Sequence, residues 1–170
     1  MRAAALSGLL ACLLTACAGY RLGPTNGLEA GSRSVRVVAF QNQTMQPRLS
    51  EAVVHALRRQ LQQDGTYRLA TRSDADADVL LTGRLVRFER ASISYAPQDL
   101  RTTRDEELRV VAQVVARDLR TGAVLLDREV TGRVTVRVGA NQTSAERQAL
   151  PVLAADLASK TVPLLVDGEW

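Results

Sequence analysis

Residues 108–138 read LRVVAQVVARDLRTGAVLLDREVTGRVTVRV, two runs of apolar and polar residues around a short polar segment. Apolar side chains recur at alternate positions through residues 108–116 and through most of residues 124–138. Such alternation is typical of strands with one buried face, and Arg120-Thr121-Gly122 supplies turn residues between them. The segment therefore predicts an antiparallel hairpin. Gly132, inside the second run, predicts a bulge or a twist.

Strand-like and helical patterns alternate upstream of the hairpin. Residues 34–40 and 79–95 predict strands and residues 67–71 a shorter one, whereas the charged residues 97–107 predict a loop. A helix is expected after Pro47, ending near Asp64 and Gly65. Its apolar face repeats every four residues, at Leu49, Val53, Leu57 and Leu61.

A second helix is predicted downstream of the hairpin. Pro151 either kinks this helix or marks its start, and Pro163 should end or bend it near Val162. The order of strand, helix, several strands and helix predicts an α+β fold, a two-layer sandwich with two helices packed on one face of a mostly antiparallel, mixed β-sheet. The apolar face of this helix comprises Ala149, Leu150, Leu153, Ala154, Leu157 and Ala158.

The first seventeen residues have the features of an export signal. Arg2 is the only charge in an otherwise mainly apolar leader, which is shorter than the roughly 20 apolar residues that span a bilayer. Leu14-Thr15-Ala16-Cys17 follows, and the stretch resembles a bacterial lipoprotein signal peptide, in which cleavage precedes a cysteine that receives lipid. We therefore expect lipidation of Cys17. By resemblance to Gram-negative lipoproteins, Ala18 after the cysteine implies sorting to the outer membrane.

This leader predicts the organisation of the chain. We expect a signal peptide over residues 1–16, a lipidated N-terminus and tether over residues 17–33, and a single α+β domain over residues 34–170. Cys12 would leave with the leader, and the one remaining cysteine would be acylated, so no intramolecular disulfide is expected.

Arginine supplies nearly all of the positive charge: Lys160 is the only lysine among 22 basic residues. The planar guanidinium matches phosphate and carboxylate groups bidentately, which suits an anionic partner. Nucleic acid, an anionic lipid surface and a phosphorylated glycolipid are the three candidates, and the alternative is that the arginines only solvate the surface. The export signal and an aromatic content of 4% argue against nucleic acid.

No catalytic or metal-binding constellation is found in the sequence. His55 is the only histidine and lies away from the apolar stripe of the first helix, so we expect it to be exposed. One histidine cannot assemble a zinc site. Asp74, Asp76 and Asp78 have the spacing of a calcium loop but lack its glycine and its distal glutamate. We expect neither catalysis nor a cofactor or metal, with a periplasmic hydrolase as the alternative from another class.

Taken in order, these segments resemble the LPS-assembly lipoprotein family LptE of Gram-negative bacteria. The matching segments are CAGYRL at 17–22, VAFQNQT at 38–44, ADVLLTG at 77–83, the turn region 119–126, and SAER at 144–147 leading into LAADLA at 153–158.

The resemblance implies an outer-membrane lipoprotein that plugs the lumen of the LptD β-barrel and assists insertion of LPS into the outer leaflet, without covalent chemistry. It also implies contact with LPS through basic residues near the strand-connecting loops. In this chain those positions are Arg101 and Arg104 in the predicted central loop and Arg137 at the end of the last strand.

A second resemblance, to the CsgG and LpoB group, remains open. That group shares a strand ending in Phe-x-Asn-x-Thr or Ser, a helix, and an Ala-Asp-x-x-Leu-x-Gly strand, which match residues 40–44 and 77–83. It implies a periplasmic lipoprotein that activates a cell-wall synthase or forms part of a secretion pore.

Overall fold

The structure, a computed structural model, describes residues 30–70, 77–96, 99–137 and 142–168. The expected signal peptide and Cys17 lie outside these residues. The described part contains the elements β1 (Arg33–Val37), β2 (Gln41–Asn42), α2 (Leu49–Asp64), β3 (Tyr67–Leu69), β4 (Val79–Ala96), β5 (Asp99–Asp118), β6 (Val124–Arg137) and α3 (Gln142–Val166).

All six strands belong to one mixed sheet, in the order β3-β1-β4-β5-β6, with β2 paired to β4 beside β1. The pairings of β1 with β3 and β4, and of β2 with β4, are parallel. The long pairings of β4 with β5 and of β5 with β6 are antiparallel, so most paired residues are antiparallel. The predicted hairpin is confirmed, with Leu108 opposite Val134 and Ala116 opposite Leu126.

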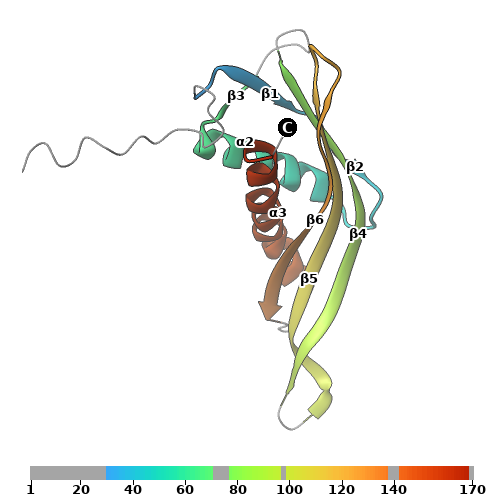
Figure 1. Cartoon of the computed structure of the whole chain (residues 1–170). Helices are drawn as coiled ribbons and strands as arrows, with labels where there is room; N and C mark the ends of the chain where they lie inside the picture. Colours follow the sequence, from blue (N-terminus) through green and yellow to red (C-terminus); the bar gives the residue numbers. More distant parts are fainter. Residues whose placement is uncertain (1–29, 71–76, 97–98, 138–141, 169–170) are drawn as a thin grey trace, which may run out of the picture.

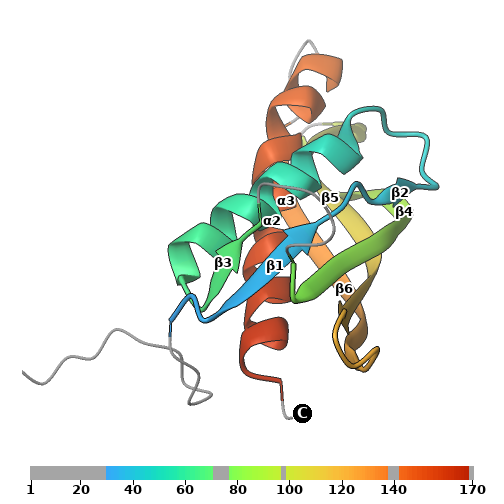
Figure 2. The same ribbon diagram turned by 90° about the horizontal axis from the view of Figure 1, so that it is seen from above.

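Both helices cover the same face of the curled sheet, which confirms the predicted α+β fold (Figures 1 and 2). α2 lies against β3 and α3, and α3 lies along β6. The predicted four-residue repeat places one face of α2 in the core, and α2 ends at Asp64 before Gly65, which has a φ of 76°. The largest fully buried side chains include Leu49, Leu57, Leu61, Leu81, Leu85, Leu108, Leu153, Leu157 and Leu165.

The loop predicted over residues 97–107 is wrong, because β5 already begins at Asp99. Charged side chains there do not prevent strand pairing, since Asp105 and Glu107 find partners on the paired strands. Ser94 Oγ donates to Asp105 Oδ2 at 2.6 Å, and Arg109 donates to Glu107 at 2.7 Å. The backbone groups are satisfied by the antiparallel ladder, so β4 and β5 form one long hairpin.

Pro151 does not mark the start of the last helix and Pro163 does not end it, since α3 continues through both prolines. Proline has no N–H group, so Pro151 and Pro163 leave the carbonyls of Arg147 and Ser159, four residues earlier, without a hydrogen-bond donor in the helix. Both prolines are exposed, and so are Arg147 and Ser159. Solvent can satisfy those carbonyls, which explains why the helix tolerates both prolines. α3 is long and apolar enough to cross a membrane by length and composition, but more than half of its most apolar stretch is buried inside the fold.

The structure has no bulge at Gly132, one of the two predicted alternatives, and instead shows a close approach of α3 there. The β5–β6 register is unbroken around Val110 opposite Gly132. A Cβ at Gly132 would lie 2.9 Å from the Leu153 carbonyl oxygen and 2.9 Å from the Leu157 Cβ. Glycine therefore allows the helix to pack directly on the strand.

Candidate functional site

The sheet extends past its helices at one end. We call this end, together with the strand segments that lead to it from under α3, the distal end: residues 86–96 of β4, 99–110 of β5 and 132–137 of β6. The pairing of β5 with β6 stops where Asp105 lies opposite Arg137. The pairing of β4 with β5 continues beyond it, to Ala96 opposite Asp99 (Figure 1). The outermost part of the distal end is thus a hairpin of β4 and β5 that projects beyond the two-layer body.

All three arginines predicted to contact a ligand lie at the distal end. Arg104 precedes Asp105, which is opposite Arg137, and Arg101 lies three residues further along β5. Arg101 and Arg104 belong to the strand rather than to a loop, and their side chains lie outside the described part of the structure. The Arg137 side chain is 71% exposed. The backbone therefore brings the three positions to one end of the sheet.

The sequence analysis missed the acid that accompanies Arg137. Asp105 Oδ1 lies 3.3 Å from Arg137 Nε, and the same carboxylate accepts the Ser94 hydroxyl at 2.6 Å. Because residues 97–107 were predicted as a loop, the cross-strand register that pairs Asp105 with Arg137 could not be foreseen. The positive charge of Arg137 is therefore partly neutralised by Asp105.

Arg133 is a further cation that the sequence analysis did not select. It is exposed, and it lies directly opposite Arg109 in the β5–β6 register. Arg109 is 2.7 Å from Glu107 and 3.9 Å from Glu89, whereas the Arg133 side chain makes no ion pair with any described residue. The alternation in residues 124–138 already placed Arg133 and Arg137 on one face, which was the available signal.

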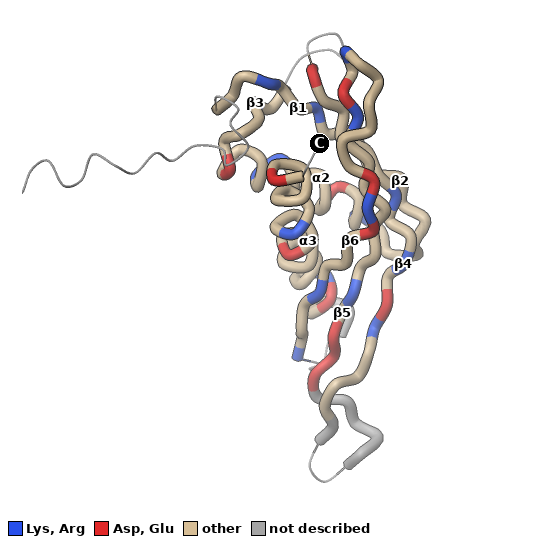
Figure 3. Tube along the Cα trace, in the orientation of Figure 1, with Lys and Arg blue, Asp and Glu red and all other residues tan. Residues whose placement is uncertain are grey.

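Acidic and basic residues are interspersed along the distal end (Figure 3). Arg90 of β4 forms a bidentate pair with Glu146 of α3, in which Nε and Nη2 donate to the two carboxylate oxygens at 2.6 and 2.9 Å. The hydrogen bond to Glu146 raises the pKa of Arg90, whose guanidinium also lies 5.1 Å from the centre of the Phe88 ring. This contact fixes the start of α3 to β4, so α3 supports the distal end.

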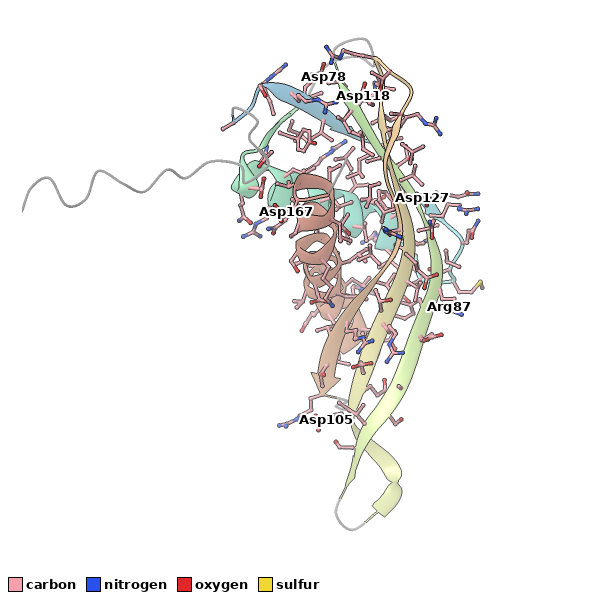
Figure 4. All side chains as sticks on the ribbon, viewed as in Figure 1. Asp78, Arg87, Asp105, Asp118, Asp127 and Asp167 are labelled. Atoms are coloured by element: carbon pink, nitrogen blue, oxygen red, sulfur yellow. The ribbon has the colours of Figure 1, made fainter. Side chains whose placement is uncertain are left out.

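A second polar cluster lies at the opposite end of the sheet, where Asp78 and Asp118 approach β1 (Figure 4). Asp78 Oδ2 accepts the Ser34 amide at 2.8 Å and the Ser34 hydroxyl at 2.9 Å, which lowers the pKa of Asp78. Asp118 accepts the amides of Thr121 and Arg120, which, with the Arg33 charge, lower the pKa of Asp118. These carboxylates hold the β5–β6 turn and β1 in place, which is a structural role.

We expect Asp118→Asn to lower the free energy of unfolding at pH 7 by about 1–2 kcal/mol, because it removes a nearly buried, charge-assisted partner of Arg33. A carboxyl with a depressed folded-state pKa stabilises the fold above its unfolded pKa, and this contribution is lost as the pH falls through the folded pKa. The gap between variant and wild type should therefore shrink toward and below pH 3.8, as measured by urea unfolding. An equal gap at pH 7 and in acid would contradict this role.

Groups that could perform chemistry are sparse in the described residues. No cluster of three or more His, Cys, Asp or Glu side chains suited to a metal ion occurs there. His55 is exposed, as predicted, on the wall of a groove between α2 and α3. Asp74 and Asp76 lie outside the described residues, and Asp78 is engaged with Ser34.

The comparison with known protein families decides the affiliation of the chain. Residues 32–162 match LptE, the lipopolysaccharide-assembly family. The chain belongs to the LptE family. No curated protein sequence matches this LptE-family chain.

Solved structures share the fold of this LptE-family chain. A DUF330 protein from Xanthomonas campestris superposes with a TM-score of 0.58 at 14% identity, covering 87% of this chain and 92% of that chain. A putative lipoprotein from Caulobacter crescentus gives 0.52 at 16%, covering 75% and 88%. A PelC dodecamer from Paraburkholderia phytofirmans gives 0.51 at 21%, covering 82% and 92%. At these identities the similarity shows the fold alone.

Proposed function

We propose that this chain is an outer-membrane lipoprotein, anchored on the periplasmic side by lipid on Cys17, that plugs an LptD-type β-barrel and assists LPS insertion into the outer leaflet. Membership of the lipopolysaccharide-assembly family supports this role. In this proposal residues 1–16 are the signal peptide, residues 17–33 the tether and residues 34–170 the working domain. The role is binding and scaffolding and needs no cofactor.

The observation that carries the proposal is the gathering of arginine positions at the distal end. Arg137 lies opposite Asp105 in the β5–β6 pairing, and Arg104 and Arg101 precede Asp105 on β5. LPS carries phosphates on its lipid A headgroup, which guanidinium groups bind bidentately. Acidic residues lie among these arginines, so the surface is not uniformly positive. It therefore favours a ligand whose negative groups meet individual arginines at defined points.

We expect the triple variant Arg101→Ala, Arg104→Ala, Arg137→Ala to bind purified LPS at least about tenfold more weakly, since each lost charged hydrogen bond weakens binding. The matched control replaces three exposed arginines elsewhere, Arg59, Arg68 and Arg120, with alanine and should stay within about twofold of wild type. Binding is measured by titration of the soluble domain with LPS at fixed salt. Wild-type affinity in the distal triple variant would reject the proposed site.

A single change should act in the opposite direction. Asp105→Asn removes the acid beside Arg137 and should raise LPS affinity by a few-fold, the scale expected of an exposed ion pair. The gain should disappear in the double variant Asp105→Asn, Arg137→Ala, because the guanidinium that Asp105 neutralises is then missing. The same LPS titration measures both variants, and a gain that persists without Arg137 would contradict the assignment.

A pull-down of the tagged mature lipoprotein from outer membranes tests the barrel partner. Recovery of an LptD-type barrel is the expected result. Recovery of a penicillin-binding protein, or of a homo-oligomeric ring, would instead support the CsgG and LpoB reading. Enzymatic activity that survives removal of the lipid anchor would support a hydrolase.

A further inference from the structure

The connection between β2 and α2 is a short loop with a defined internal structure. The Asn42 side chain spans it, donating from Nδ2 to the Gln46 carbonyl at 2.8 Å and accepting the Thr44 amide and hydroxyl at 3.0 and 2.7 Å. The Gln43 amide donates to the Leu85 carbonyl at 3.0 Å, which ties the loop to β4. Residues 42–48, which we call the docking loop, are therefore held in one conformation.

The docking loop presents Met45 with its side chain 100% exposed. A single exposed apolar residue is common on protein surfaces. Here the backbone that carries it is already ordered, so little conformational entropy remains to be lost when Met45 is buried by a partner. Methionine also adapts its flexible side chain to pockets of different shape. The loop thus has the properties of a preformed contact point.

A cationic hollow adjoins Met45. Its volume is about 350 Å³, and its walls are Gln46, Pro47, Arg48, Glu146, Arg147 and Leu150. Arg48 and Arg147 are exposed and form no ion pair with any described residue, whereas Glu146 is held by Arg90 at 2.6 Å. The hollow therefore carries two guanidinium groups without an ion-pair partner among the described residues, beside the fully exposed Met45.

We propose that the docking loop and this hollow form a binding surface for a protein partner that presents an apolar pocket beside an acidic loop. Met45 enters the pocket, and a carboxylate of the partner enters the hollow between Arg48 and Arg147. Charge complementarity favours an acidic loop, because guanidinium groups pair with carboxylates in a bidentate arrangement. This surface lies outside the distal end, so it adds a contact to the proposed function and does not depend on it.

A lipid surface fits these observations less well. Met45 is flanked by the polar side chains of Thr44 and Gln46, and Thr44 Oγ1 and the Gln46 carbonyl are already hydrogen-bonded within the loop. One methionine gives only a small gain on entering a bilayer, which must cover the cost of desolvating these polar neighbours. A shaped protein pocket can accept the methionine alone and leave its neighbours hydrated.

Site-specific crosslinking of the full-length lipoprotein in its bacterial host tests the surface. A photo-crosslinking benzoylphenylalanine replaces Met45, and in the control it replaces Leu119, which is 41% exposed at the β5–β6 turn. The expected result is a protein adduct at position 45, absent at position 119, whose crosslinked peptide contains Asp or Glu. A phospholipid adduct alone, no adduct, or a peptide without acidic residues would overturn the proposal.

Variants of the tagged lipoprotein without the crosslinker then test the contact quantitatively. The measurement is the amount of the partner, identified beforehand by crosslinking, that each variant recovers in a pull-down. Met45→Ala, and separately Arg48→Glu with Arg147→Glu, should each reduce recovery at least about tenfold, while Leu119→Ala leaves it unchanged. Asn42→Ala keeps Met45 but frees the loop, and should reduce recovery a few-fold. Equal thermal melting of all variants excludes unfolding. Undiminished recovery with Met45→Ala or the double variant would overturn the proposal, whatever partner the wild type recovers.

Discussion

Replacing Gly83 with alanine should lower the free energy of unfolding by about 3 kcal/mol, because the added methyl group has no room. Gly83 lies in β4 opposite Val114. A Cβ there would lie 2.6 Å from the Gln113 carbonyl oxygen and would also overlap the Phe40 ring. The carbonyl belongs to the β5 backbone, so relief requires the paired strands to shift.

Urea unfolding followed by far-UV circular dichroism measures this effect. Thr82→Ala is the matched control, since it changes the neighbouring, half-buried residue without adding atoms, and it should cost less than about 1 kcal/mol. Adding Phe40→Leu to Gly83→Ala should recover only part of the loss, because the clash with the Gln113 carbonyl remains. Wild-type stability of the single Gly83 variant would show that the strands accommodate a side chain there.

Gly83 also marks the limit of what the sequence could predict about the fold. The repeat that placed Leu49 and Leu57 on one face, and the alternation from Leu108 onward, are local patterns, and both are confirmed. The close approaches at Gly83 and Gly132 depend on residues 43 and 21 to 25 positions away, Phe40 and the α3 leucines. A single sequence contains no signal for such contacts, which arise only when the layers pack.

The candidate site, too, has one feature that the sequence predicted and one that it did not. That Arg101, Arg104 and Arg137 share one end of the sheet followed from the order of the strands alone. The ion pair of Arg137 with Asp105 could not be predicted from that order. The two side chains meet only because β5 extends into the predicted loop and pairs there with β6. The mixture of acidic and basic residues within residues 99–109 was visible, but strand pairing was needed to show which charges meet.

α3 links the body of the fold to the edge of the sheet. The Arg133 amide donates to Asp156 Oδ2 at 2.7 Å, and Lys160 Nζ donates to the Thr131 carbonyl at 3.1 Å. These side chains satisfy backbone groups on the outer edge of β6, the kind of edge that would otherwise be open to pairing with another chain. Displacing α3 would therefore expose the β6 edge and loosen the base of the distal end.

Leu157→Ala should weaken the packing of α3 on the sheet at a cost of about 3 kcal/mol in the free energy of unfolding, through lost burial and a residual cavity. Leu157 is fully buried, and its Cβ faces Gly132 of β6, so the neighbouring strand backbone cannot follow a shortened side chain into the space. Val152→Ala on the same helix is the control: that side chain is 56% exposed, and its loss should cost less than about 0.5 kcal/mol. Calorimetry measures the stabilities, and amide exchange at Arg133 should rise in the Leu157 variant alone. Equal losses in the two variants would mean that α3 is held by its exposed face, contrary to its burial against the sheet.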